Sequence, residues 1–168
     1  MKFLLLAVFF AATFPSCEFP VKREKQTAEK SVSKIRNGIE ISSKGIKVEQ
    51  AFLLFDDGNL VPEGNKVKVK QNVKLRVICK GWKTKNGKVF LSGSEIVETS
   101  EKNVLLNDST LFREYESGIS PSDAEYISMD VVITQVTRLY DYYKIIFRIN
   151  DLSDNRNIVE GYYKLYLD

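Results

Sequence analysis

The sequence predicts an all-β protein, an antiparallel β-sandwich of about seven strands in residues 46–168. Apolar and polar residues alternate through most of the chain after Gly45, which is the pattern of strands that bury one face. Clusters of Gly, Asn, Asp and Pro interrupt this alternation at the short intervals of antiparallel sheets. No segment after Gly45 has the apolar period of a long amphipathic helix.

The strands follow one another along the chain with little between them. We expect them at residues 46–55, 66–85, 88–98, 103–115, 124–137, 142–150 and 158–167. The clearest is 66–85, which has apolar residues at the odd positions Val67, Val69, Val73, Leu75, Val77 and Cys79 and basic residues at the even positions Lys66, Lys68, Lys70, Lys74, Arg76 and Lys80. Gln71 and Asn72 interrupt the apolar series, which predicts a bulge or a break into two strands at that point.

Turn residues separate these strands. Asn86-Gly87 predicts a hairpin, because both residues tolerate the positive φ of a type I′ turn. Residues 116–122 are expected to form a loop, since Pro121 cannot take part in regular strand pairing. Ser122 or Asp123 is expected to cap one short turn of helix in this loop.

This layout resembles the immunoglobulin-like sandwiches often found in bacterial surface lipoproteins. The resemblance rests on strand number and turn placement over roughly residues 46–168. It implies a core tryptophan, for which Trp82 is the candidate, although the inter-sheet disulfide of many such domains is absent. A C2-like or a jelly-roll sandwich would give almost the same pattern, and both remain alternatives.

The first seventeen residues predict export. Lys2 is followed by an apolar run from Phe3 to Ala12, and Ser16 stands directly before Cys17. A basic start, a short apolar core and a small residue at the cleavage point are typical of a signal peptide. The apolar run is about half of the roughly 20 residues that a membrane-spanning helix needs. We therefore assign residues 1–16 to a signal peptide.

The surroundings of Cys17 resemble the lipobox of bacterial lipoproteins. Ser16 suits the position before the cysteine, whereas Phe14 and Pro15 depart from the family pattern. The resemblance implies that the Cys17 thiol is acylated with palmitate-type chains and that Cys17 becomes the mature N-terminus. Two or three acyl chains would hold the protein stably on a membrane, since each buried CH2 contributes about 0.8 kcal/mol.

Residues 17–45 are interpreted as the lipidated N-terminus and a flexible tether. The segment is rich in charge and poor in apolar residues, so it cannot bury enough surface to offset the entropy of ordering. Its bias is basic, but the whole chain has a formal charge of only +3. That balance argues against a nucleic-acid partner, which requires a concentrated basic patch.

The residue inventory limits the possible chemistry. The chain has no histidine, which removes the commonest general base and the commonest metal ligand. No Ser-x-x-Lys, Gly-x-Ser-x-Gly or phosphate-binding glycine motif occurs. Cys79 lies in the apolar register of its strand, and we expect it to be a buried core residue. We expect no catalytic residue and no cofactor.

Two groups of polar residues are candidates for binding. Oxygen ligands for calcium are concentrated in one loop, at Asp151, Asp154, Asn155 and Asn157. A second acidic group at 56–59 would join it if both fell at the same end of the sandwich. The alternative for both groups is ordinary turn formation by Asx residues, which we favour. The basic stripe from Lys66 to Arg76 is interpreted as a solvated strand face.

The last 29 residues contain six of the eight tyrosines. We expect Tyr142, Tyr162 and Tyr166 to share an exposed sheet face, where they would form an aromatic patch for a protein or a glycan. The alternative is that these tyrosines serve as strand formers that pack in cross-strand pairs.

The first hypothesis is a bacterial envelope lipoprotein, anchored to a membrane by lipid, whose sandwich is a non-enzymatic binding or structural module. The partner would be a protein or a glycan at a sheet face or edge. The second hypothesis is a carbohydrate-recognition module for nutrient capture, which tyrosines converging in a groove would favour. The third is a small hydrolase, which two carboxylates facing each other in a concave site would favour.

The anchor can be tested directly. Replacing Cys17→Ser removes the thiol that would carry the acyl chains, so we expect the variant protein to leave the membrane fraction. Immunoblotting of fractions after a high-salt wash measures the result. A Ser variant that stays in the washed membranes would show that acylation is not the anchor.

Overall fold

The computed structural model describes residues 34–113, 117–134 and 138–168. These residues belong to one compact unit that spans residues 31–168. Its elements are β1 (Lys34–Ile35), β2 (Glu40–Lys44), β3 (Lys47–Phe55), β4 (Lys66–Val67), β5 (Asn72–Lys80), β6 (Thr84–Lys85), β7 (Lys88–Val89), β8 (Leu91–Thr99), β9 (Val104–Leu111), α1 (Pro121–Ala124), β10 (Tyr126–Val132), β11 (Tyr143–Asp151) and β12 (Ile158–Leu167).

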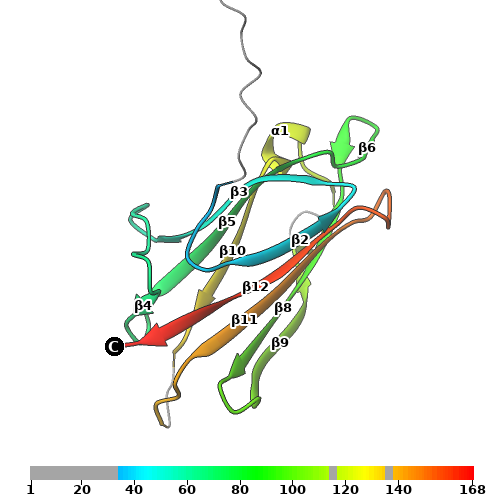
Figure 1. The fold of residues 1–168 in the computed structure, drawn as a ribbon. Coiled ribbons are helices and arrows are strands. Elements are labelled where there is room, and N and C mark those ends of the chain that lie inside the picture. The colour runs from blue at the N-terminus through cyan, green and yellow to red at the C-terminus, as the bar shows by residue number, and fades with distance from the viewer. Residues whose placement is uncertain (1–33, 114–116, 135–137) are drawn as a thin grey trace, which may run out of the picture. The chain divides into compact units, whose positions relative to one another are not determined.

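The strands form a β-sandwich, as the alternation predicts (Figure 1). Sheet A has the strand order β1-β3-β5-β10, and sheet B has the order β2-β12-β11-β8-β9. The long neighbours all pair antiparallel, whereas the two-residue strands β1 and β4 pair parallel with β3 and β12. The short hairpin β6-β7 stands apart from both sheets.

The connectivity is immunoglobulin-like. Strands β3, β5 and β10 follow the order A-B-E of that fold in one sheet, and β12, β11, β8 and β9 follow the order G-F-C-C′ in the other. No strand occupies the D position beside β10 in the described part of the chain. The segment between β9 and β10 instead forms a bridge from Ile119 to Val89 and the short helix α1.

The core lies between the inner faces of the two sheets. Alternate residues of β5 and β11 are fully buried, as period-two patterning requires. Cys79 is one of them, which confirms its prediction as a core residue, and burial raises the pKa of its thiol to about 12. Trp82 is also buried at the end of β5, where its indole N–H donates to the Ala124 carbonyl oxygen at 2.9 Å.

Several local predictions are confirmed. Asn86 and Gly87 have φ values of 52° and 74° in the turn between β6 and β7. The strand expected at 66–85 breaks before Asn72, where β5 begins. The helical turn is present, but its N-cap is Ser120 and not Ser122 or Asp123. Pro121 fits the first helical position because that residue needs no hydrogen-bond donor.

The domain begins earlier than predicted. Strands β1 and β2 lie in the segment 17–45 that we assigned to the tether, so that boundary is wrong for residues 34–44. Strand β2 pairs with β12 and places Ile41 opposite Gly161. The sequence EISSK of β2 hides this role, because edge strands are held by backbone hydrogen bonds and need few apolar side chains.

A buried amide pair ties this early segment to the sandwich. Asn37 Nδ2 donates to the Val61 carbonyl oxygen at 2.9 Å and to Asn65 Oδ1 at 3.0 Å, and Asn37 Oδ1 accepts from the Leu53 N–H. Asn65 Nδ2 donates to the carbonyl oxygens of Asn37 and Lys164, at 2.8 Å each. Buried polar side chains with all partners in place fix a single arrangement of the segments they join.

The pairing of β2 with β12 can be tested at Gly161. A Cβ at this position would lie 2.9 Å from Phe147 Cζ and 3.0 Å from Ile41 Cα, and would press on the Glu40 carbonyl oxygen. We expect Gly161→Ala to lower the free energy of unfolding by about 1–3 kcal/mol, the range for overpacking. Urea unfolding measures the change.

The control is Ser42→Ala, which alters an exposed side chain of β2 without crowding the strand. A Gly161→Ala variant within about 0.5 kcal/mol of the wild type would contradict the close packing of β2 on β12.

Candidate functional site

The loop predicted as a calcium candidate is organised around Asp151. Both of its carboxylate oxygens accept hydrogen bonds: Oδ1 from the N–H groups of Ser153 and Asp154, and Oδ2 from the Lys83 N–H and from Asn157 Nδ2, at 2.7–3.2 Å. Asp151 and Asn157 are buried. These contacts match the alternative in which the Asx residues form the turn.

Asp154 has a different partner. Arg156 Nε and Nη2 donate to its two oxygens at 2.9 Å and 2.7 Å, and these hydrogen bonds lower the pKa of Asp154 to about 2. Asn155 is exposed beside this pair. Among the described residues no group of three or more His, Cys, Asp or Glu is placed to hold a metal ion.

The second acidic group lies at the other end of the sandwich. Gly45, before β3, packs against Asn157, whereas Asp56 follows the last residue of β3. A strand of nine residues is about 30 Å long, so the two groups do not meet. Asp57 instead accepts hydrogen bonds from Asn59, and Asp56 accepts one from Asn72.

The basic stripe from Lys66 to Arg76 does not form one strand face. Lys66 lies on β4, Lys68 and Lys70 lie in the following turn, and only Lys74 and Arg76 lie on β5. Lys66 and Lys74 form exposed ion pairs with Asp168 and Asp130, at 3.4 Å and 3.5 Å. This arrangement matches the interpretation of the stripe as solvated surface.

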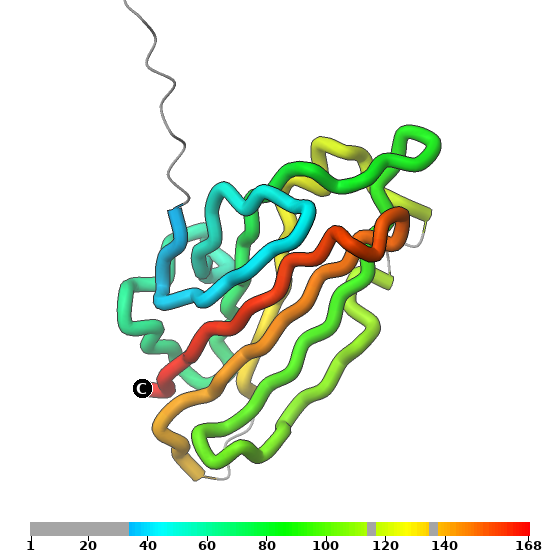
Figure 2. Tube along the Cα trace, turned by 45° about the vertical axis from the view of Figure 1, so that its right-hand side comes forward, coloured from blue at the N-terminus to red at the C-terminus, as the bar shows by residue number. Residues whose placement is uncertain are grey.

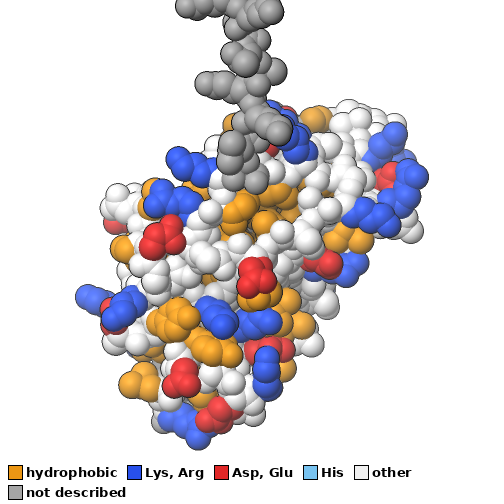
Figure 3. All heavy atoms as spheres, viewed as in Figure 1, with side chains coloured by type: hydrophobic (Ala, Val, Ile, Leu, Met, Phe, Trp, Pro, Cys, Tyr) orange, Lys and Arg blue, Asp and Glu red, His pale blue; other side chains and the backbone are white. Residues whose placement is uncertain are grey.

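The predicted tyrosines do share a face. Tyr142, Tyr162 and Tyr166 lie together on the outer side of sheet B, interleaved with Lys144 and Lys164; we call these five residues the tyrosine–lysine face. The rings of Tyr142 and Tyr166 are 6.5 Å apart in an edge-to-face arrangement. Figure 3 shows apolar and basic side chains alternating over β11 and β12.

The lysines cover two of the three rings. Lys144 Nζ is 4.0 Å from the centre of the Tyr162 ring, and Lys164 Nζ is 4.3 Å from that of Tyr142, within the range of cation–π attraction. Neither lysine has an ion-pair partner among the described residues. The face therefore presents unpaired positive charge on an aromatic base.

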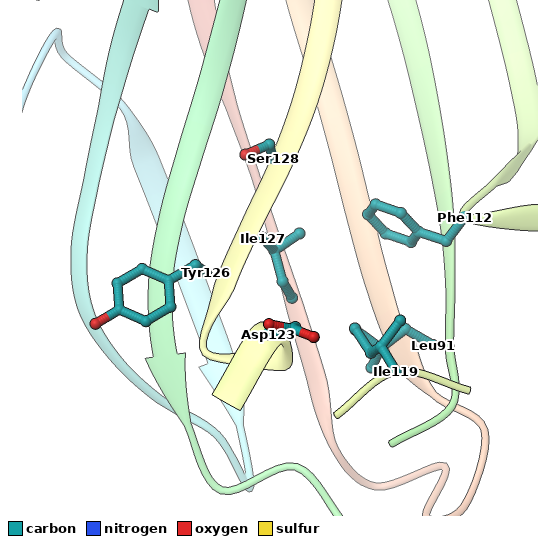
Figure 4. Close-up of a pocket in the computed structure, with 7 residues that line it drawn as sticks. All are labelled: Leu91, Phe112, Ile119, Asp123, Tyr126, Ile127 and Ser128. Carbon is teal, nitrogen blue, oxygen red and sulfur yellow. The ribbon is translucent and has the colours of Figure 1, made fainter. Parts of the chain in front are cut away.

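Two hollows lie along the edge of the sandwich, between β10 and sheet B. The first, of about 280 Å³, is near α1 (Figure 4). It is lined by Leu91, Phe112, Ile119, Asp123, Tyr126, Ile127 and Ser128. Phe112 and Ile127 point toward each other across this hollow, whereas Tyr126 points to the outer side of β10.

The second hollow, which we call the edge hollow, lies farther along β10 and has a volume of about 460 Å³. It is lined by Glu95, Val97, Leu105, Leu106, Asp130, Val131, Val132, Ile133 and Thr134. Glu95 is only 3% exposed and has no hydrogen-bond or ion-pair partner within the described part of the chain. A buried carboxyl without a partner is rare in proteins.

Glu95 belongs to the inner face of β8, in register with Leu91, Gly93 and Val97. Burial, together with the nearby charges of Asp108 and Asp130, raises the pKa of Glu95 to about 7. Asp108 stands directly opposite Glu95 on β9, where hydrogen bonds from Thr110 lower the pKa of Asp108.

Glu95 is not among the site residues predicted from the sequence. Its signal is one acidic residue at an odd position in the alternating series Leu91, Gly93, Glu95, Val97, Thr99. A single charged residue among apolar ones indicates an unusual site only when it is known which residues of the strand face the core.

Cys17 lies outside the described residues, and so does most of the predicted tether. In the part of the chain that is described, no helix has the length and apolar character needed to cross a membrane.

Comparisons with known proteins give one distant structural match. No protein family and no curated protein matches this sequence. Among solved structures, the chain is similar to a crystal structure of the C-terminal domain of wzt, with 10% sequence identity and a TM-score of 0.48. The match covers 82% of this chain and 83% of that domain.

The buried carboxyl of Glu95 leads to a pH-dependent prediction. Because its folded pKa of about 7 exceeds the usual 4.5, Glu95 binds its proton more tightly in the folded state. The stability that the protonated Glu95 contributes to the fold is therefore fully present below about pH 4.5, and it is lost as the pH rises through 7. We expect Glu95→Gln to remove this loss and to be more stable than the wild type at pH 8 by up to about 3 kcal/mol.

Urea unfolding of both proteins between pH 4.5 and pH 8 measures the difference. Glu98→Gln removes a carboxylate from the outer side of the same strand and is the matched control. An equal pH-dependent gain in the Glu98 variant, or none in the Glu95 variant, would contradict burial as the cause.

Proposed function

We propose that this protein is a membrane-anchored lipoprotein of the bacterial envelope whose sandwich is a non-enzymatic module for binding another protein. The observation that carries the binding part is the tyrosine–lysine face on β11 and β12. Support for the anchor comes from the leader and from Cys17 in the sequence.

The residue types of this face suit a protein partner. Tyrosine is enriched at protein interfaces, where a rigid ring supplies contact area at little entropic expense. Lys144 and Lys164 add two positive charges that form no ion pair with the described residues, so an acidic surface on the partner would complement them. Ion pairs such as Arg148–Glu160, at 3.1 Å, flank the face and are satisfied within this chain.

The carbohydrate alternative has less support. Sugars stack on exposed ring faces, and the lysine ammonium groups cover the rings of Tyr142 and Tyr162. The face is also the outer side of a sheet and not a groove. Of the three rings in this face, that of Tyr166 has no lysine over it, and Tyr166 is 37% exposed.

The hydrolase alternative also has less support, although Glu95 and Asp108 lie opposite each other. Thr110 donates two hydrogen bonds to Asp108 Oδ1 at 2.7 Å, which occupies that oxygen. The third carboxylate, Asp130, pairs with Lys74 on the outer side of sheet A and does not face Glu95. The remaining lining of the edge hollow is apolar apart from Thr134, so few groups are available to orient a polar substrate.

Charge reversal tests the proposed face. We expect the double change Lys144→Glu and Lys164→Glu to lower recovery of the partner at least tenfold when the full-length protein is cross-linked in envelopes and purified, because it would repel an acidic surface. Arg148→Ala on the same sheet side is the control and is expected to leave recovery unchanged. Quantitative mass spectrometry of the cross-linked proteins measures recovery.

Equal recovery with the reversed face would contradict the proposal. A glycan array probed with the full-length protein covers the alternative: binding that depends on Tyr166 would favour carbohydrate recognition over a protein partner.

A further inference from the structure

The two sheets have unequal widths at the edge formed by β9 and β10. Sheet A ends at β10, whereas sheet B continues past β8 to β9. Figure 2 shows β9 at the outer edge, beyond the layer that contains β10. The inner side of β9 therefore has no strand over it among the described residues, and Leu105 and Leu106, which line the edge hollow, are 51% and 43% exposed.

The free edge of β10 can accept another strand. Two hydrogen bonds flank β10: the Cys79 N–H donates to the carbonyl oxygen of Glu125, and the Lys70 N–H donates to the carbonyl oxygen of Ile133. The odd-numbered residues of β10 therefore direct their backbone groups toward β5. Since these directions alternate along a strand, Ser128, Asp130 and Val132 direct theirs away from sheet A. No strand pairs with that side in the described part of the chain.

The lining of the edge hollow sets the character of an added strand. Apolar side chains form its walls, and Glu95 lies in it without a partner. Asp108 lies next to Glu95 on the inner face, and Asp130 lies at the rim. Among the described residues, no lysine or arginine lines the hollow. Lys74 pairs with Asp130, and the charge of Arg113 lowers the pKa of Asp108.

These charges favour one occupant over the others. A second copy paired through β10 would bring two sets of these carboxylates together, which like charge opposes. We propose that the edge hollow binds an extended segment of a partner protein, which adds a strand to β10 and places a lysine or arginine side chain against Glu95 and Asp108. This site is separate from the tyrosine–lysine face.

The spacing defines a short motif. Val97 on β8 lies opposite Leu106 on β9, and Glu95 lies opposite Asp108. The two pairs are separated by two residues on each strand. A strand laid over them directs every second side chain inward, at the same spacing of about 7 Å. An apolar residue would cover the first pair and a basic residue the second. The motif is therefore apolar-x-basic, with β-augmentation supplying the backbone hydrogen bonds.

The probe is a fluorescent seven-residue peptide, Thr-Val-Thr-Lys-Thr-Val-Thr, with blocked ends. Fluorescence anisotropy measures its binding to the full-length protein in mild detergent. We expect saturable binding, a loss of at least tenfold when the lysine is changed to glutamate, and a similar loss when alternate backbone nitrogens are methylated. The methylated peptide removes hydrogen bonding without any change in the protein.

Two protein variants and two control variants complete the test. Glu95→Gln keeps the shape of the side chain and is expected to weaken binding at least tenfold, whereas Glu98→Gln leaves binding unchanged. Val132→Pro removes one outward N–H from the free edge, a position where proline is tolerated in sheets, and is expected to weaken binding similarly. Circular dichroism verifies that each variant is folded, and Lys144→Glu is expected to bind the peptide as the wild type does.

Three results would overturn the proposal. The first is absence of binding at millimolar peptide, or equal binding of the glutamate peptide. The second is binding that appears only after residues 20–30 are deleted, which would assign the hollow to this chain's own N-terminal segment. The third is a dimer of the wild type that Val132→Pro dissociates, which would assign the free edge to a second copy.

Discussion

The unequal width of the two sheets is the constraint on which the unusual parts of this structure depend. A sandwich buries its strands only where each has a counterpart in the other sheet. Strand β9 has none among the described residues, so it remains exposed on both sides, with a burial pattern unlike that of any other long strand. Glu95, one strand inward, is covered by the core but borders this open edge.

The chain covers the two edges of the sandwich in different ways. At one edge the chain adds β1 to sheet A and β2 to sheet B, and the amides of Asn37 and Asn65 join that segment to the rest. At the other edge the described residues between β9 and β10 form no strand: Gly118 adopts a φ of 75° and Pro121 starts a helix. The Phe112 ring instead packs over Gly93, whose missing side chain leaves room for it. The edge therefore closes partly, with hollows on both sides of this contact.

Much of this fold is predictable because period-two alternation reports burial directly. The series through Val73, Leu75, Val77 and Cys79 identifies a buried strand and its inner face from the sequence alone. The parity of Tyr142, Tyr162 and Tyr166 likewise predicts their shared outer face. Strands β1 and β2 escape the same reasoning, because backbone pairing and buried amides hold them and their side chains carry little apolar periodicity. Alternation does not reveal at which end of the sandwich a loop lies, because that depends on the topology. The sequence therefore did not show that the acidic groups at 56–59 and 151–157 are far apart.

The placement of charge links the fold to binding. The tyrosine–lysine face is positive and lies on the outer side of sheet B, whereas the edge hollow is acidic and opens between the sheets. A ligand that complements one surface is repelled by the other, so each surface selects its own class of partner. The described chain enters the sandwich at β1, three strands away from β10 in sheet A, or about 14 Å at the usual strand spacing. The free edge of β10 therefore lies on the side of sheet A opposite β1, and its outward backbone groups pair with no strand among the described residues.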